Sequence, residues 1–296
     1  MRVICHSAEN NIGSKQSVKC KRPVEIYVFI DPLCAEAWAL EPILKKLYLH
    51  YNDVFTIRHV ITSKLQRLNL AKGNKPSNIA AVWEHTASRS GMSCDGDLWF
   101  EDPIATPYAA SIGIKAAELQ GKHAGVRFLR KMQETMFLKK QNVSKEEVLI
   151  KIAEKAGLDI HEFQKDLHSE GAVKAFQCDL KISGEMEIDR SPSLVFFNNE
   201  NIDSEGLKVT GQYEYEVYEQ ILKDIFQRDI QPKPLPKIEQ FLSHYSFVAA
   251  KEIEVVYNMT CKEVETMMRK LALKGEVKCV PVKYGTFWRY IGKKNT

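Results

Sequence analysis

Residues 23–37 read Pro-Val-Glu-Ile-Tyr-Val-Phe-Ile-Asp-Pro-Leu-Cys-Ala-Glu-Ala. The run from Val24 to Ile30 is almost continuously apolar or β-branched, which predicts a strand that is buried on both faces. Asp31 and Pro32 end that strand, and Cys34 follows at the predicted start of a helix. Backbone N–H groups and the helix dipole lower the pKa of a thiol at such a position. The segment therefore places a candidate reactive cysteine between a buried strand and a helix.

The position three residues after Cys34 limits what this cysteine can do. In thioredoxin-type redox proteins a second thiol at that position resolves the mixed disulfide. Here the position is Ala37. A chain without the resolving thiol cannot complete the usual dithiol cycle, so we expect the fold to hold a partner rather than to turn over a substrate.

Length and composition predict a globular cytoplasmic protein. The chain has 296 residues, a net charge of +4 and seven cysteines. The length favours two domains. No apolar run is typical of a secretory signal or a membrane-spanning helix. An odd, scattered set of cysteines suits a reducing compartment better than a disulfide framework.

The pattern along the chain predicts four parts. Residues 1–22 are expected to form a flexible arm, and residues 23–230 an α/β domain with a helical insertion over about 76–171. In the helix after Cys34, the apolar stripe predicts Lys45 and Lys46 on the outer face. Prolines at alternate positions make residues 231–237 the candidate linker. Residues 238–296 contain two predicted helices followed by a β-hairpin, an order typical of a small winged-helix-like α+β domain.

The order of elements in the first domain resembles the thioredoxin-like proteins of the DsbA group. The shared features are the strand, the Cys34 helix, the helical insertion, Pro192 before a strand, and a closing helix. This resemblance implies that the Ser191–Pro192 bond is cis, and that its loop faces Cys34 and leaves backbone groups free for an extended partner. Trp38, directly after this site, is expected either to shape a partner groove or to pack in the core.

A closer resemblance covers nearly the whole chain. Several blocks, in order, resemble the SpxH (YjbH) family of ClpXP adaptor proteins: Asp31-Pro32-Leu33-Cys34, Trp38-Ala39-Leu40-Glu41-Pro42, Ser88-Arg89-Ser90-Gly91-Met92-Ser93-Cys94-Asp95-Gly96, Lys115-Ala116-Ala117-Glu118-Leu119-Gln120-Gly121, Phe247-Val248-Ala249 and Lys251-Glu252-Ile253. The resemblance implies a non-catalytic cytoplasmic adaptor that binds the transcription regulator Spx and promotes its degradation by the ClpXP protease. It also implies a DsbA-like domain joined to a winged-helix-like domain.

The same resemblance raises the question of zinc, because some relatives carry an N-terminal Cys/His cluster that binds this metal. The corresponding residues here are Cys5, His6 and Cys20. They lack the regular spacing of a zinc finger, and no fourth ligand can be identified. A disordered tail without metal is the alternative.

The basic charge is concentrated near the C-terminus. Residues 232–296 contain twelve Lys or Arg against six Asp or Glu. Lys262, Arg269 and Lys270 on a predicted helix could follow the phosphates of DNA. However, Glu263 and Glu265 interrupt that surface, and no set of side chains suited to reading base edges is evident. We therefore expect this helix to contact protein.

The sequence thus predicts a partner surface with two parts. One part is the neighbourhood of Cys34, Trp38, Ser191 and Pro192, and the other is the basic helix near the C-terminus. Two alternatives stay open at this point. One is a thiol-disulfide oxidoreductase that uses Cys34, and the other is a DNA-binding regulator that uses the C-terminal domain.

Overall fold

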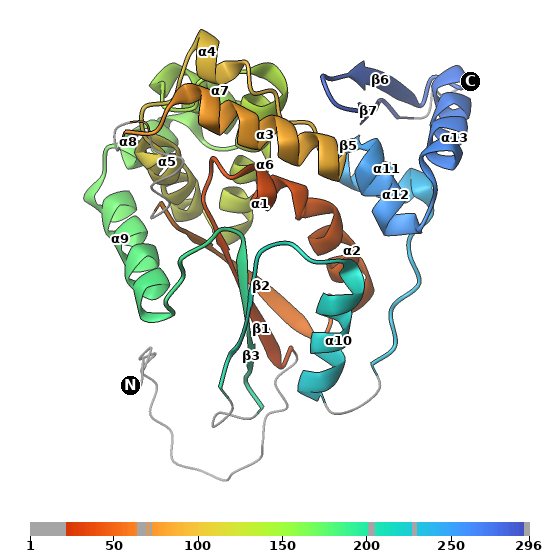
Figure 1. Cartoon of the computed structure of the whole chain (residues 1–296), viewed down its shortest axis with the longest axis horizontal. Coiled ribbons are helices and arrows are strands. Elements are labelled where there is room, and N and C mark those ends of the chain that lie inside the picture. Colours follow the sequence, from red (N-terminus) through yellow and green to blue (C-terminus); the bar gives the residue numbers. More distant parts are fainter. Residues whose placement is uncertain (1–21, 64–69, 71–72, 201–204, 227–229, 293–296) are drawn as a thin grey trace.

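The structure is a computed structural model that describes residues 22–63, 70, 73–200, 205–226 and 230–292. Figure 1 shows three regions: a central sheet, a layer of helices that covers it, and a C-terminal unit of helices and short strands beside the first helices. None of the described helices is both long and apolar enough to cross a membrane.

The central sheet has the strand order β2-β1-β3-β4. Its strands are β1 (Val24–Ile30), β2 (Phe55–Ile61), β3 (Ser193–Asn198) and β4 (Leu207–Thr210). Strand β1 runs parallel to β2 and antiparallel to β3, which in turn pairs antiparallel with β4. Val24, Ile26 and Val28 are fully buried, which confirms the predicted central strand.

Two helices follow the strand β1 in line and lie against the sheet. They are α1 (Ala35–Ala39) and α2 (Glu41–Tyr51), with Leu40 between them. The helix α10 (Tyr215–Phe226) packs beside α2 after the last strand. Strand β1 lies between β2 and β3 in the sheet, and α1 follows at its end (Figure 1).

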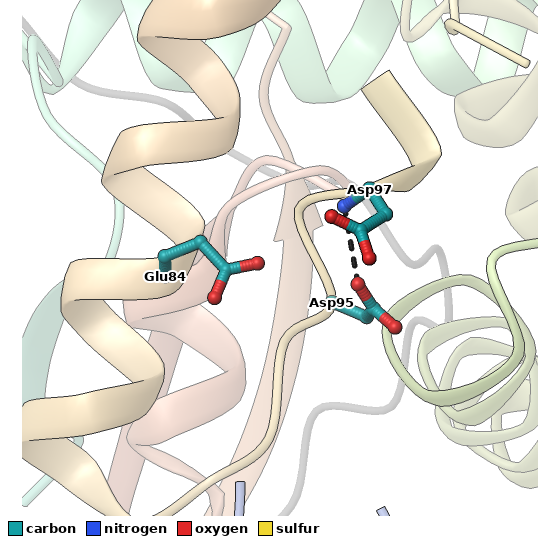
Figure 2. Close-up of side chains that lie close together, drawn as sticks. All are labelled: Glu84, Asp95 and Asp97. Atoms are coloured by element: carbon teal, nitrogen blue, oxygen red, sulfur yellow. Dashed lines mark hydrogen bonds between the residues drawn. The ribbon is translucent and has the colours of Figure 1, made fainter. Parts of the chain in front are cut away.

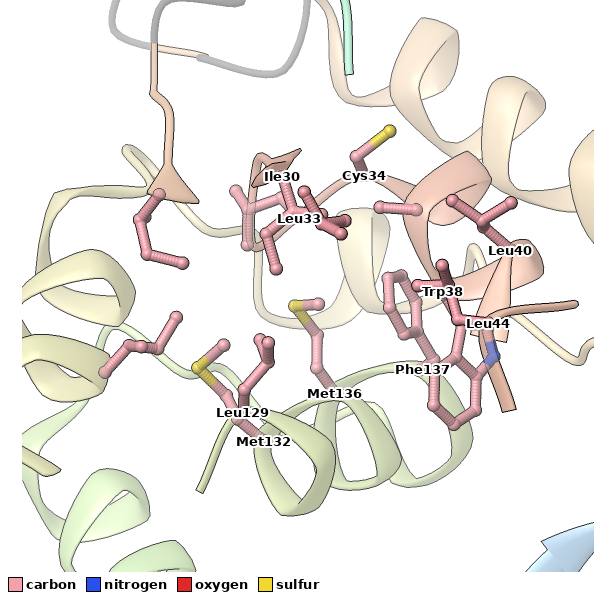
Figure 3. Packing of buried hydrophobic residues seen from close by; sticks show 14 of the residues in the cluster. Ile30, Leu33, Cys34, Trp38, Leu40, Leu44, Leu129, Met132, Met136 and Phe137 are labelled. Carbon is pink, nitrogen blue, oxygen red and sulfur yellow. The ribbon is translucent and has the colours of Figure 1, made fainter. Parts of the chain in front are cut away.

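In the described part of the connection between β2 and β3, seven helices cover one end of the sheet. They are α3 (Pro76–Ser90), α4 (Leu98–Glu101), α5 (Tyr108–Leu119), α6 (Lys122–Lys139), α7 (Glu146–Lys155), α8 (Ile160–Leu167) and α9 (Glu170–Glu185). In the close view of Figure 3, Leu129, Met132 and Met136 of α6 face Leu33 and Ile30 at the end of β1. The helices therefore bury the segment that carries Cys34.

The C-terminal unit begins after residues 230–237, which have no regular secondary structure. Its elements are α11 (Ile238–Tyr245), β5 (Phe247–Ala249), α12 (Ala250–Tyr257), α13 (Cys261–Leu273), β6 (Val277–Pro281) and β7 (Thr286–Tyr290). The three strands form an antiparallel sheet in the order β5-β7-β6. Phe241, Val248 and Ile253 belong to a separate hydrophobic core inside this unit.

The prediction that Lys45 and Lys46 lie on an outer face is wrong. Only 8% and 4% of these side chains are exposed, because α12 packs along the face of α2 that carries them. Lys45 contacts Glu252 and Lys46 donates to Asn258, both from the C-terminal unit. The periodicity within α2 could not reveal this second packing surface, because its partner lies some 200 residues further along the chain.

Candidate functional site

Cys34 occupies the position that the sequence predicts, as the N-cap residue of α1. The turn before it is fixed locally: the Cys34 N–H donates to the Asp31 carbonyl over 3.0 Å, and the Leu33 N–H donates to Asp31 Oδ1 over 2.9 Å. The Trp38 N–H donates to the Cys34 carbonyl over 3.2 Å and begins the helix. Asp31 thus shapes the turn that presents the thiol.

The Ser191–Pro192 bond is cis, as the resemblance implies, and its loop faces Cys34. The Cys34 Sγ donates to the Ser191 carbonyl over 3.3 Å, and the Asp31 N–H donates to Ser191 Oγ over 2.9 Å. The Pro192 carbonyl accepts from the Gly211 N–H over 2.8 Å. The backbone carbonyls that were expected to be free for a partner are therefore already bonded within the chain.

The environment of the Cys34 thiol favours its neutral form. Only 3% of the residue is exposed. Burial raises the pKa of Cys34 to about 11, with a further upward contribution from the negative charge of Asp31, and these outweigh the hydrogen bonds that favour the thiolate. A reactive thiol needs the opposite shift, because the thiolate is the nucleophile. At neutral pH Cys34 is thus a protonated, buried hydrogen-bond donor.

The structure places Trp38 in the core, which was one of the two alternatives for this residue. Trp38 is 0% exposed, and its indole N–H donates to the Ser93 carbonyl over 3.1 Å. Its ring stacks between Phe137 of α6 and Phe287 of β7, at centroid distances of 5.7 and 6.2 Å. The prediction that Trp38 binds a partner is therefore wrong. Trp38 joins the C-terminal unit to the rest of the fold.

A buried charged cluster holds the C-terminal unit on α2 and α6. The carboxylate of Glu252 is 0% exposed and accepts from Arg130 Nη1 and Nη2 over 3.0 and 2.9 Å, and from the Ala249 N–H over 2.7 Å. Lys45 contacts the same carboxylate. Burial alone would raise the pKa of Glu252, but the charges of Arg130 and Lys45 outweigh it and lower the pKa to about 2. The ionised carboxylate therefore ties three helices together.

A second cluster holds the turn between β6 and β7 against α3. Figure 2 shows Glu84 on one side of Asp95 and Asp97, whose oxygens approach one another closely enough to suggest a metal site. However, Lys283 Nζ lies 2.8, 3.2 and 3.1 Å from Glu84, Asp95 and Asp97, respectively. The lysine already supplies the positive charge, so the cluster works as a docking point. Sequence reasoning missed it because its members are far apart in the chain.

The basic residues predicted to bind a partner lie elsewhere. Lys262, Arg269 and Lys270 are exposed on α13, at the edge of the C-terminal unit in Figure 1. The structure therefore brings Cys34, Ser191 and Pro192 together but leaves these three residues apart from them. The predicted zinc ligands Cys5, His6 and Cys20 lie outside the described residues, so zinc binding stays a prediction.

Comparisons with known proteins agree with this geometry. The family model described as Thioredoxin matches residues 27–220. Two curated relatives, both named ClpXP adapter protein SpxH, are 50% identical to the chain. The relative from Halalkalibacterium halodurans aligns over 98% of this chain and 95% of its own length. The relative from Bacillus subtilis aligns over 91% of this chain and 90% of its own length.

Solved structures show the same fold at low sequence identity. A putative protein disulfide isomerase from Nitrosomonas europaea matches 70% of this chain and 98% of its own, with a TM-score of 0.60 and 18% identity. A probable DsbA oxidoreductase from Streptomyces coelicolor matches 72% of this chain and 94% of its own, with a TM-score of 0.54 and 15% identity. These matches confirm the predicted thioredoxin-like, DsbA-like α/β fold.

Proposed function

This chain belongs to the thioredoxin family and, within it, to the ClpXP adapter proteins named SpxH, and from this membership we infer that it is a cytoplasmic adaptor. We propose that it binds the transcription regulator Spx and enhances the degradation of Spx by the ClpXP protease. An adaptor of this kind raises the effective concentration of its client at the protease and breaks no covalent bond.

The buried, neutral thiol of Cys34 is the observation that favours an adaptor over an oxidoreductase. A disulfide exchange needs an accessible thiolate and a second thiol to release the product. Cys34 is 3% exposed, its pKa is raised to about 11, and Ala37 stands where the resolving cysteine would be. These properties of Cys34 favour a protein that binds a partner over an enzyme that exchanges disulfides.

The C-terminal unit supports a second contact surface for the client or the protease. Its element order is helix, strand, helix, helix, strand, strand, which is the order of a winged helix. We propose that this unit contacts protein, because Glu263 and Glu265 interrupt the basic face of α13 and Arg269 pairs with Glu265 over 3.3 Å. Carboxylates on that face would repel the phosphates of DNA.

Reconstituted proteolysis tests the proposed function. Purified ClpXP, ATP and Spx are mixed with and without this chain, and the loss of Spx is followed over time. We expect the chain to accelerate the loss of Spx while a ClpXP substrate that needs no adaptor is degraded at an unchanged rate. An unchanged rate of Spx loss, with no complex between Spx and the chain, would refute the proposal.

A further inference from the structure

A cleft of about 310 Å³ lies between the thioredoxin-like domain and the C-terminal unit. Its walls come from α2, the end of α3, the start of α10 with the segment before it, and α12. In Figure 1 these helices meet on the side of the molecule opposite to α9. The cleft is thus built from both units, and docking of the C-terminal unit completes it.

Hydrogen bonds connect one wall of the cleft to the end of α1 and to the loop of the cis proline. Gln212 lines it, and the Gln212 side chain donates to the Ala39 carbonyl at the end of α1 over 3.0 Å. The preceding residue, Gly211, is the one that donates to the Pro192 carbonyl. A polypeptide in this cleft would therefore lie close to the loop of the cis proline without needing the Cys34 thiol.

Lys46 supplies a buried positive charge to this cleft. Its side chain is almost fully buried, and its Nζ donates to Asn258 Oδ1 over 2.6 Å and lies 4.2 Å from the centre of the Tyr215 ring. Within the described part of the chain, no carboxylate forms an ion pair with Lys46; Glu216 and Glu219 act on it only at longer range. A buried ammonium has three donors and is stabilised by a counter-ion, so Lys46 can form an ion pair with a carboxylate of another molecule.

Arg89 provides a second positive charge, which is exposed, at the end of α3. Its guanidinium donates to Gln212 Oε1 over 3.2 Å, and this neutral partner leaves several of its five donors available. The third cation of the cleft, Lys251, already pairs with Glu254 over 3.2 Å. Among the described residues, Lys46 and Arg89 are therefore the two cleft cations that lack a carboxylate partner.

The remaining lining limits the chemistry of the ligand. Tyr213 is 49% exposed and offers an aromatic surface, while Glu214 and Glu216 add negative charge to the exposed lining. These carboxylates would repel a densely charged polyanion such as nucleic acid, but a single carboxylate can still reach the two cations. This combination fits a protein segment that carries one acidic residue beside an apolar or aromatic one.

We propose that this cleft binds an acidic segment of the client protein, with an Asp or Glu carboxylate between Lys46 and Arg89 and a neighbouring side chain against Tyr213. The inference deepens the proposed function, on which it rests, by assigning a surface and a chemistry to client recognition. It uses neither Cys34 nor the basic face of α13.

The variant Lys46→Gln/Arg89→Gln tests this assignment in the full chain, with Spx as the ligand. The control Lys174→Gln/Lys181→Gln removes the same charge from exposed surface pairs on α9. Because hydrogen bonds between charged groups are the strong ones, we expect the cleft variant to bind Spx at least about tenfold more weakly, and the control to bind within about twofold of the wild type. Equal binding by the cleft variant and the control would overturn the inference.

A second measurement does not depend on the stability of the Lys46 variant. A photoreactive phenylalanine analogue replaces Tyr213, and the complex with Spx is irradiated and its cross-links are mapped. Cross-links at an acidic segment of Spx would support the inference, and cross-links confined to other surfaces, or none, would overturn it. If wild-type chain neither binds Spx nor accelerates its degradation, the proposed function fails as well, whereas failure of the cleft alone leaves wild-type activity intact.

Discussion

Substitution of Glu252 by Gln should destabilise the protein by about 3–4 kcal/mol. The side chain keeps its size, but Lys45 and Arg130 lose the negative charge that both of them contact. The pKa of Glu252 lies at about 2, against an ordinary value of 4.5, and each pKa unit equals roughly 1.4 kcal/mol at neutral pH. The resulting figure of about 3–4 kcal/mol agrees with the roughly 3–5 kcal/mol typical of breaking one side of a buried ion pair.

The same substitution should change the dependence of stability on pH. Because the pKa of Glu252 is lower in the folded state, its contribution is fully present above pH 4.5 and is lost as the pH falls towards about 2. Guanidinium unfolding at pH 7 and at several values below pH 4.5 measures both effects. The difference between wild type and variant should shrink as the pH falls through that window.

A matched control lies on the same helix. Glu254 pairs with Lys251 nearer the surface, so Glu254→Gln should lower the free energy of unfolding by less than about 1 kcal/mol. The reasoning would be refuted if Glu252→Gln cost no more than this control, or if the difference from wild type did not depend on pH. Since Glu252 holds the C-terminal unit in place, the variant should also bind Spx more weakly.

Three further predictions concern the cysteines and the contacts between the two units. At pH 7 an alkylating reagent should modify the buried Cys34 and Cys94 far more slowly than the exposed cysteines, and guanidinium should abolish the difference; rapid labelling of native Cys34 would contradict its raised pKa. Lys283→Ala leaves Glu84 and its acidic neighbours without their cation, so proteolysis of the last hairpin should become faster; unchanged proteolysis would argue against a docking role. Trp38→Ala should lower the free energy of unfolding by about 3–5 kcal/mol, as expected for a large aromatic removed from a core, and a loss below 1 kcal/mol would contradict its placement.

The sequence predicted the parts of the fold that depend on local pattern. The strand from Val24 to Ile30 is apolar or β-branched except for Glu25, and Asp31 and Pro32 end it just before Cys34 starts the next helix. The cis bond before Pro192 followed from the resemblance to the DsbA group, because the local sequence does not determine this isomer. Together these features place Cys34 opposite the loop of Pro192.

The contacts between the two units could not be predicted in the same way. Trp38 packs between Phe137 and Phe287, and no pattern near Trp38 indicates these distant partners. The sequence predicts Lys46 at the surface because the periodicity of a helix reveals one apolar face, whereas the C-terminal unit covers α2 on a second face. The sequence does contain one signal, because Glu252 shares a face of α12 with the apolar residues Ile253 and Val256. Its charge partners, however, are not identifiable from the sequence.

The most direct test of an adaptor that works without thiol chemistry is the initial rate of Spx degradation by ClpXP in the presence of wild-type chain or of Cys34→Ser. We expect both proteins to accelerate degradation to the same extent, because the Cys34 thiol is buried and neutral and forms no bond with the client. If the serine variant lost the acceleration while it remained folded, the client would depend on the thiol, and the central claim would be contradicted.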